Sequence, residues 1–163
     1  MGFDALSVKG RALRYLAQRE HSRAELERKL ARQVTDTEVA TAQQQITRAL
    51  DALAAAGLLS DTRAAASVLA GQGQRSGVRR LRQILQFKGL APDLVSDTLR
   101  RARETELQRA QDVWRRRFGV PATDPKDRAR QLRFMAGRGF ESDIARRVVQ
   151  GSSDDDDPVA DPD

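Results

Sequence analysis

The chain has 163 residues and a formal net charge of +6, and 32% of its residues are charged. It contains no cysteine, which excludes disulfides and thiolate metal sites and is compatible with a reducing compartment. No apolar run approaches the roughly 20 residues of a membrane span, and no signal peptide is visible near the start, so we expect a cytoplasmic protein without a membrane partner.

The composition favours helices. Aromatic residues make up 4% of the chain, β-branched residues are sparse, and strong helix formers such as Ala, Leu, Arg and Gln abound. Apolar residues also recur at the three- and four-residue spacing of a helix that buries one face. The sequence therefore predicts an all-α fold.

Clear start and stop signals mark the first three predicted helices. The first helix runs from about Ser7 to Arg19. Capping boxes, in which a hydroxyl and a carboxylate three residues apart satisfy each other's backbone amides, open the second helix at Ser22 and the third at Thr35. Gly57 is the natural end of the third helix. The residues expected to face the core are Leu13, Leu16, Leu26, Leu30, Val39, Ile46, Leu50 and Leu53.

The next three helices follow the same pattern. Ser60 can cap a helix that runs to about Ala70, and Ser76 can cap a second that ends at Gly89. Pro92 is tolerated in the first turn of a third helix. The residues expected to face inward are Val68, Leu69, Val78, Leu81, Leu85, Leu94, Val95 and Leu99.

The last three helices begin at about Glu104. Asp124 is a cap followed by a first-turn proline, Gly139 ends that helix, and Ser142 can cap the last one. The residues expected to face inward are Leu107, Ala110, Trp114, Phe118, Ala129, Leu132, Met135, Ile144 and Val148.

An internal repeat relates two of these segments. Residues 80–95 read RLRQILQFKGLAPDLV and residues 130–145 read RQLRFMAGRGFESDIA, and they match when shifted by fifty positions. Each is a basic amphipathic helix, a turn made of a cation, a glycine and an apolar residue, and a second helix. A chain that repeats one helical unit is more typical of a binding surface than of a pocket enzyme.

The repeat predicts how the chain is organised. We expect an elongated, curved array of three tandem three-helix units, because each unit is too small for a sizeable core of its own. The units cover residues 1–59, 60–103 and 104–150. A disordered acidic tail over residues 151–163 follows, since this polar, aspartate-rich segment has no means of packing.

The positive charge lies outside this tail. The tail holds six of the 23 acidic residues, so residues 1–150 carry a net charge of +12, and 25 of the 29 basic residues are arginine. Residues 61–150 alone have twenty basic against ten acidic groups. A surface of this kind attracts phosphate backbones or acidic protein surfaces.

The order of segments over residues 8–150 resembles the RecX family, whose members regulate the RecA recombinase. Each matching fragment is weak alone, but their joint order is specific. The fragments are ALRYLAQREHSRAELERKL at 12–30, GLLSDTR at 57–63, RSGVRRLRQ at 75–83 with KGL at 88–90, and DPKDRARQLRFM at 124–135 with RGF at 138–140.

The chain departs from the family pattern in two places. The family usually carries an aromatic residue after the arginine of the first junction, whereas Arg63 is followed here by Ala-Ala-Ala-Ser. The partner contact of that aromatic is therefore in doubt. The aspartate-rich tail is not part of the pattern.

The resemblance implies a non-enzymatic regulator that needs no cofactor. Such a protein is expected to act as a monomer that lodges in the helical groove of the RecA–DNA filament. It would inhibit filament growth, ATP hydrolysis, strand exchange and stimulated repressor cleavage, and it could touch DNA within or beside the filament.

Arginines supply the candidate contacts, and each has a plainer interpretation. The densest patch is Arg75, Arg79, Arg80 and Arg82, which could meet an acidic filament surface or DNA phosphate, or could form a solvated face opposite the core. Lys88 is a fifth candidate and could instead cap a helix end. A secondary basic surface consists of Arg128, Arg130, Arg133, Arg138, Arg146 and Arg147.

Other candidate sites favour structural interpretations. Trp114 and Phe118 could stack on bases, but their spacing indicates core residues. His21 is the only histidine and has no second ligand for a metal. The glycines of 71–77 lack the Gly-Lys-Ser/Thr of a phosphate loop, and Asp154 to Asp157 could bind a divalent cation or compete with DNA.

A second functional hypothesis is a direct DNA-binding transcription regulator. The segment at 46–60 looks like the recognition helix of a winged-helix domain. No alternating strands follow to form a wing, and the helix carries a single cation, Arg48.

Overall fold

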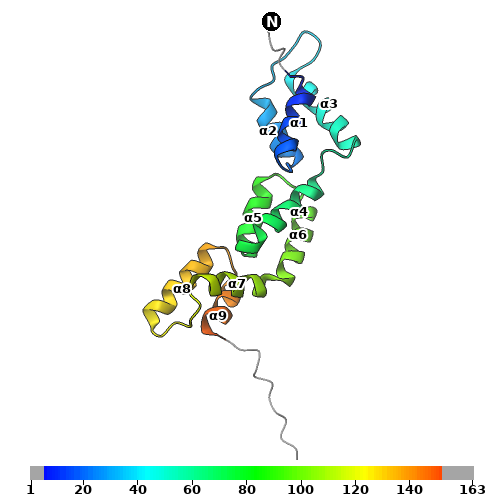
Figure 1. Cartoon of the computed structure of the whole chain (residues 1–163). Helices are drawn as coiled ribbons and strands as arrows, with labels where there is room; N and C mark the ends of the chain where they lie inside the picture. Colours follow the sequence, from blue (N-terminus) through cyan, green and yellow to red (C-terminus); the bar gives the residue numbers. More distant parts are fainter. Residues whose placement is uncertain (1–5, 152–163) are drawn as a thin grey trace, which may run out of the picture. The chain divides into compact units, whose positions relative to one another are not determined.

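In the computed structural model, which describes residues 6–151, the chain is helical and contains no strand within that range. Figure 1 shows the helices in chain order. The all-α prediction is therefore confirmed, and none of the described helices is long and apolar enough to cross a membrane. The helices are α1 (Val8–Gln18), α2 (Arg23–Ala31), α3 (Ala42–Ala55), α4 (Asp61–Gly71), the 3-10 turn η1 (Gly73–Arg75), α5 (Val78–Phe87), α6 (Pro92–Glu104), α7 (Glu106–Arg117), α8 (Pro125–Gly137) and α9 (Ser142–Gln150).

The helices form two compact units by their internal contacts. The first unit comprises Met1–Gly71 with Arg82–Thr98, and the second comprises Gln72–Leu81 with Leu99–Asp163. The chain passes from the second unit back to the first within α5, after Leu81, and returns to the second within α6, after Thr98. The division into three tandem units and the elongated, curved shape stay predictions. The predicted tail, including Asp154 to Asp157, lies outside the described residues beyond Gly151.

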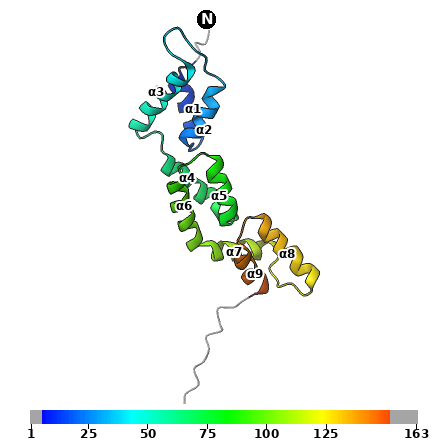
Figure 2. The ribbon, with the colours of Figure 1, turned by 180° about the vertical axis from the view of Figure 1, so that it is seen from behind.

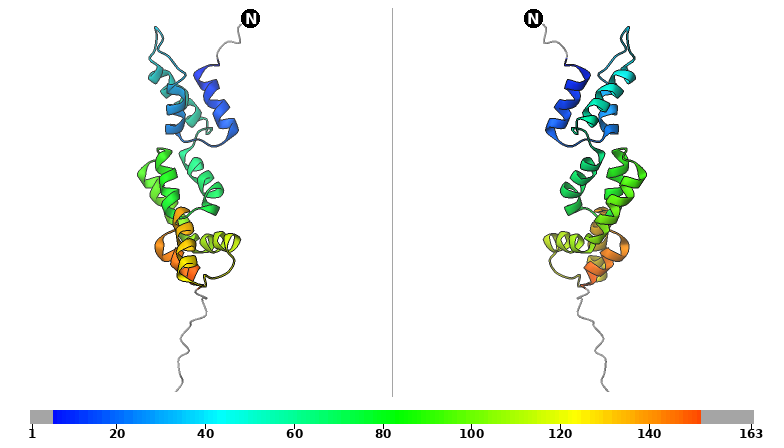
Figure 3. Two further views of the ribbon diagram at one scale, coloured as in Figure 1. Left: turned by 90° about the vertical axis from the view of Figure 1, so that its left-hand side faces the viewer. Right: turned by 90° about the vertical axis from the view of Figure 1, so that its right-hand side faces the viewer.

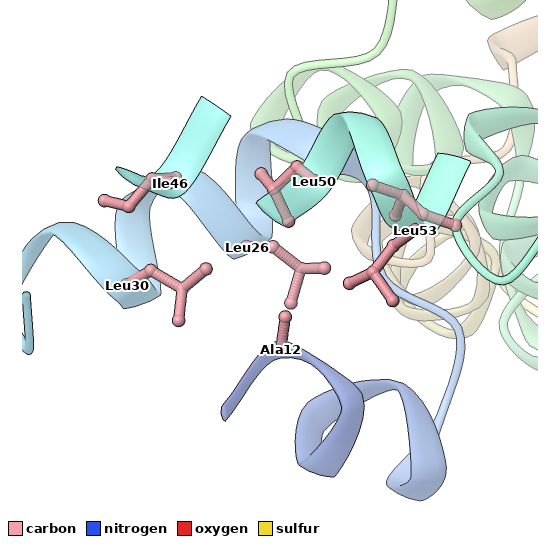
Figure 4. Packing of buried hydrophobic residues seen from close by; sticks show 7 residues of the cluster. Ala12, Leu26, Leu30, Ile46, Leu50 and Leu53 are labelled. Carbon is pink, nitrogen blue, oxygen red and sulfur yellow. The ribbon is translucent and has the colours of Figure 1, made fainter. Parts of the chain in front are cut away.

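The core of the first unit is built by α1, α2 and α3, which pack against one another (Figure 3). Its buried residues are Ala12, Leu26, Leu30, Ile46, Leu50, Leu53 and Leu59. Figure 4 shows six of them between the three helices: Ala12 of α1, Leu26 and Leu30 of α2, and Ile46, Leu50 and Leu53 of α3. Each large apolar side chain buried in this way contributes about 1.5–3 kcal/mol relative to exposure.

Two residues predicted for this core lie outside it. On α1, Ala12 is fully buried and Leu13 is 37% exposed, so the inward face is rotated by one position from the prediction. Val39 is 90% exposed because α3 begins at Ala42 rather than near Thr35.

The start of α3 is set by a different capping box from the one predicted. Thr41 accepts a hydrogen bond from the Gln44 amide, and the Gln44 side chain accepts one from the Thr41 amide. The predicted box at Thr35 belongs instead to a loop, in which the Asp36 carboxylate accepts from the Ala42 amide at 2.7 Å.

Most of the other predicted helix ends are confirmed. Asp124 caps α8 by accepting from the Asp127 amide at 2.8 Å, and Ser60 accepts from the Arg63 amide at 3.2 Å. Gly89 and Gly139 follow α5 and α8 with φ of +69° and +82°, a conformation that residues with a side chain rarely adopt. The prediction for α9 is wrong by one residue, because Glu141 rather than Ser142 occupies the cap position.

The core of the second unit is formed by α7, α8 and α9, which pack together (Figure 2). Its buried residues are Ala110, Val113, Met135, Phe140, Ala145, Val148 and Val149. Trp114 packs against this cluster, and its indole N–H donates to the Gln131 side chain at 2.7 Å. The ring of Phe118 meets Phe134 edge-on, with centroids 5.3 Å apart. The contacts of Trp114 confirm its core interpretation, whereas Phe118 is half-buried and packs on Phe134 beside the cluster.

The internal repeat reappears as a junction in the first unit, between the start of α2 and the turn after α5. The Ser22 hydroxyl donates to the Lys88 carbonyl. A Cβ on Gly89 would lie 2.6 Å from the Cβ of Ala24, so the turn lies directly against the helix. Asp61 at the start of α4 accepts from the Arg23 amide at 2.8 Å.

The second unit contains the matching junction, between the start of α5 and the turn after α8. The Gly77 amide donates to the Arg138 carbonyl at 2.9 Å, and the Arg79 amide donates to the Gly139 carbonyl at 3.0 Å. Glu106 at the start of α7 accepts from the Val78 amide at 3.0 Å, as Asp61 does in the first unit. The internal repeat therefore corresponds to the same contact, between the start of one helix and the turn after another, in each of the two units.

Candidate functional site

The four arginines of the predicted patch are all exposed. Arg75 ends η1, and the other three lie on α5, whose residues Val78, Leu81 and Leu85 are fully buried. Arg75, Arg79 and Arg80 belong to the second compact unit and Arg82 to the first. Within residues 6–151, none of the four guanidinium groups forms an ion pair with a carboxylate.

The position of Arg79 and Arg80 is unfavourable for the helix itself. Both lie in the first turn of α5, where the helix macrodipole disfavours cations by about 0.3–1 kcal/mol each. The acid that satisfies this helix start is Glu106, which is 3% exposed and bound to the Val78 amide. Folding therefore does not account for two adjacent cations at this point.

The junction also brings Arg138 close to this pair. The Arg138 carbonyl accepts from Gly77, and a Cβ on Gly139 would lie 2.4 Å from the Cβ of Arg80. The guanidinium of Arg138 lies 5.2 Å from the Phe134 ring. The sequence analysis predicts a separate, secondary surface for Arg138. The two segments in contact are more than fifty residues apart in the chain, so no local pattern relates them.

Lys88 is engaged inside the fold. Its side chain is 14% exposed, and its ammonium lies 2.9 Å from the Glu25 carboxylate. Its carbonyl accepts from Ser22. Lys88 therefore stabilises the junction of the first unit.

Glu25 is the charged centre of that junction. Burial would raise the pKa of this carboxyl, but the Ser22 amide, the Lys88 ammonium and the Arg19 guanidinium outweigh it and lower the pKa to about 2. Next to it, burial lowers the pKa of the His21 imidazole, which is 1% exposed and donates to the Arg19 carbonyl at 3.0 Å. His21 is therefore a packed, hydrogen-bonded residue.

Replacing Glu25 with glutamine is expected to destabilise the fold at neutral pH by roughly 2–3 kcal/mol. The ionised group stabilises the fold because its folded-state pKa lies below the ordinary value of 4.5. This contribution is lost as the pH falls from about 4.5 to about 2, so wild type and variant should converge in urea melts at acid pH. Glu27→Gln, which removes a half-exposed pair with Arg23, should cost less than about 1 kcal/mol. A constant Glu25→Gln difference from pH 7 to pH 2 would contradict this account.

The six arginines of the secondary surface are exposed, but not all are equivalent. Arg130 pairs with Asp127 at 2.5 Å and lies 5.6 Å from the Phe118 ring, so the fold itself accounts for it. The residues of this set on α8 and in the turn after it are Arg128, Arg130, Arg133 and Arg138, and those on α9 are Arg146 and Arg147.

Arg109 is a structural residue that the sequence did not single out. Its guanidinium donates to the carbonyls of Gly73, Ser76 and Ala102. Burial lowers its pKa, and the nearby Glu106 carboxylate partly offsets this effect. Arg109 thus fixes the η1 turn that precedes α5. The connector at 71–77 therefore directs carbonyls toward a cation, which is the opposite of a phosphate loop.

The described residues contain no group of three or more His, Cys, Asp or Glu placed to hold a metal ion. The described residues also contain no strand that could form the wing of a winged-helix domain. In the segment at 46–60, Ile46, Leu50 and Leu53 are core residues.

Comparisons with known proteins give a consistent result. Residues 9–42 match the family domain described as RecX, first three-helix domain, and residues 104–149 match RecX, third three-helix domain. The Regulatory protein RecX of Leptothrix cholodnii is 50% identical over 89% of this chain and 88% of its own length. The protein of the same name from Ralstonia nicotianae is 42% identical over 94% and 96%, respectively.

Solved structures support the fold. RecX from Lactobacillus salivarius superposes with a TM-score of 0.70 at 18% identity, over 88% of this chain and 93% of that one. A second structure, described as regulatory protein RecX, gives 0.66 at 21% identity, over 86% of this chain and 70% of that one.

Proposed function

This chain belongs to the RecX family of regulatory proteins, and on that basis we propose that it binds the RecA–DNA filament and inhibits RecA. The activities it would suppress are ATP hydrolysis, strand exchange and the stimulated cleavage of repressor. The proposal requires no catalytic residue and no cofactor, and it has the protein acting as a monomer in the cytoplasm.

The observation that carries the proposal is the pair Arg79 and Arg80. Both are exposed, neither has an ion pair with a carboxylate in the described part of the chain, and both lie where the helix dipole disfavours them. Arginine forks match carboxylate and phosphate oxygens. We assign the filament contact to these two residues, together with Arg75 and Arg138 from the same compact unit. Arg82 belongs to the first unit and stays a separate candidate.

Titration of the protein into RecA hydrolysing ATP on single-stranded DNA tests this function. We expect inhibition at a molar ratio below one molecule of this protein per RecA molecule. The reason is that one bound molecule would block filament growth beyond its position. The readout is the rate of phosphate release. An unchanged rate at equimolar protein would show that the chain does not regulate RecA in this way.

A further inference from the structure

The first compact unit contains a second cationic site that the filament proposal does not use. It is a pocket of about 380 Å³, within the range of about 300–1,000 Å³ typical of ligand pockets. The residues that line it are Arg19, Glu25, Arg28, Lys29, Arg32 and Phe87.

Phe87 is the unusual member of this pocket. Its side chain is 75% exposed although it is large and apolar. The guanidinium carbon of Arg28 lies over one face of the ring, 5.0 Å from its centroid, and the guanidinium donates a hydrogen bond of 2.7 Å to the Phe87 carbonyl. The ring is thus held in place while much of it stays open to solvent.

The internal repeat indicates that the fold does not need this ring. Phe87 corresponds to Gly137 in the second copy, and a Cβ placed on Gly137 would meet no atom within 4 Å. The last position of the basic helix therefore borders open space in one copy and carries an exposed aromatic ring in the other. A ligand is a better explanation of the ring than packing.

The charge of the pocket is strongly positive. Four of the six lining residues are cations, and the single acid, Glu25, already binds Lys88 at 2.9 Å and Arg19 at 3.1 Å. Arg32 at the end of α2 is exposed and has no ion pair with a carboxylate of residues 6–151. Anionic ligand groups would therefore meet uncompensated cations next to an open aromatic face.

We propose that this pocket binds one nucleotide of a single-stranded DNA segment. The base stacks on the face of Phe87 that Arg28 leaves open, and the flanking phosphates are bound by Arg28, Lys29 and Arg32. Proteins that bind single strands combine an aromatic platform with a cationic path in this way. An acidic peptide would use the cations but would leave the phenyl ring exposed. The site goes beyond the filament proposal, because it uses different residues and is available in the free protein.

The test measures binding of a labelled oligothymidine of twelve nucleotides to the full chain by fluorescence anisotropy, at low salt and without RecA. Phe87→Ala should weaken binding about 5- to 150-fold, as expected for loss of one stacked base. Arg32→Glu should also weaken it and reduce its salt dependence. Leu58→Ala is the matched control, because Leu58 is an exposed apolar residue of the same unit, 48% exposed, that does not line the pocket; it should bind like wild type.

An abasic oligomer of equal length separates stacking from charge. The wild-type affinity for the abasic oligomer should be about equal to the Phe87→Ala affinity for oligothymidine. The Phe87→Ala substitution should not lower the affinity for the abasic oligomer any further. Circular dichroism establishes that each variant is folded. Because RecA is absent, the outcome is independent of the function proposed above.

Three results would overturn the proposal. One is equal affinity of folded Phe87→Ala and wild type for oligothymidine. Another is displacement of the oligonucleotide by an aspartate-rich peptide at lower concentration than by unlabelled oligothymidine, which would assign the pocket to a protein partner. The third is equal competition by thymidine monophosphate at the same nucleotide concentration, which would assign it to free nucleotides.

Discussion

Replacing Arg79 and Arg80 together with glutamate should raise the concentration needed for half-inhibition of the RecA ATPase at least about 30-fold. The physical reason is that reversing charges that contact an acidic surface both removes attraction and adds repulsion, a change of about 2–5 kcal/mol for closely paired groups. The measurement is an inhibition curve for the variant beside that of wild type, at one fixed salt concentration.

The same substitution should leave the fold intact or stabilise it slightly. Glutamate in the first turn of α5 is favoured by the helix dipole, by about 0.3–1 kcal/mol per residue at exposed positions. Arg115→Glu with Arg116→Glu, an equal charge change at exposed positions of α7, is the matched control and should inhibit like wild type. A folded Arg79/Arg80 variant with undiminished inhibition would refute the assigned surface. Equal loss of inhibition in both double variants would show that net charge alone causes the effect.

Gly77→Ala is the substitution expected to damage the fold most. A Cβ at this position would lie 2.2 Å from the Phe140 nitrogen and 2.3 Å from the Gly139 carbonyl carbon and oxygen. These are backbone atoms of the turn against which α5 begins, so no flexible side chain can move aside. We expect a loss of more than about 4 kcal/mol, which is a large share of the roughly 5–15 kcal/mol that stabilises an ordinary protein.

Thermal unfolding followed by circular dichroism measures this effect. The matched control is Gly137→Ala, at the end of α8, where the added Cβ meets no atom within 4 Å. It should be neutral or stabilising by up to about 1 kcal/mol, because alanine is the better helix former. Equal melting temperatures for the two variants would be incompatible with the described contact between Gly77 and the Gly139 turn.

These two predictions concern the same place in the molecule. The turn that packs closely against Gly77 contains Arg138 and Gly139, and the same turn lies against Arg80. A folded variant with altered charge and a variant with a disrupted junction should therefore both lose inhibition, and only the second should lose helix content.

The fold could be predicted where the signals were local. Helix ends at Gly89 and Gly139 follow from glycine's access to positive φ, and the cap at Asp124 follows from the residue and the proline after it. The start of α3 could not be predicted, because Thr35–Glu38 and Thr41–Gln44 are both plausible boxes. The choice between them depends on how the loop at Asp36 folds back on Ala42.

The candidate site could be predicted only in part, since its geometry depends on distant residues. Exposure of Arg79 and Arg80 follows from the apolar face of their helix. The engagement of Lys88 depends on Glu25, 63 positions earlier, and the placement of Arg138 depends on Gly77. No local pattern marks Arg109, because the carbonyls it binds come from two other segments.

The most direct test of the central claim is binding to the filament itself. RecA filaments are assembled on single-stranded DNA with a non-hydrolysable ATP analogue, mixed with the wild-type chain and sedimented. We expect the wild-type protein in the pellet and the Arg79/Arg80 variant in the supernatant. Wild-type protein that stays in the supernatant with the filaments pelleted would contradict the account.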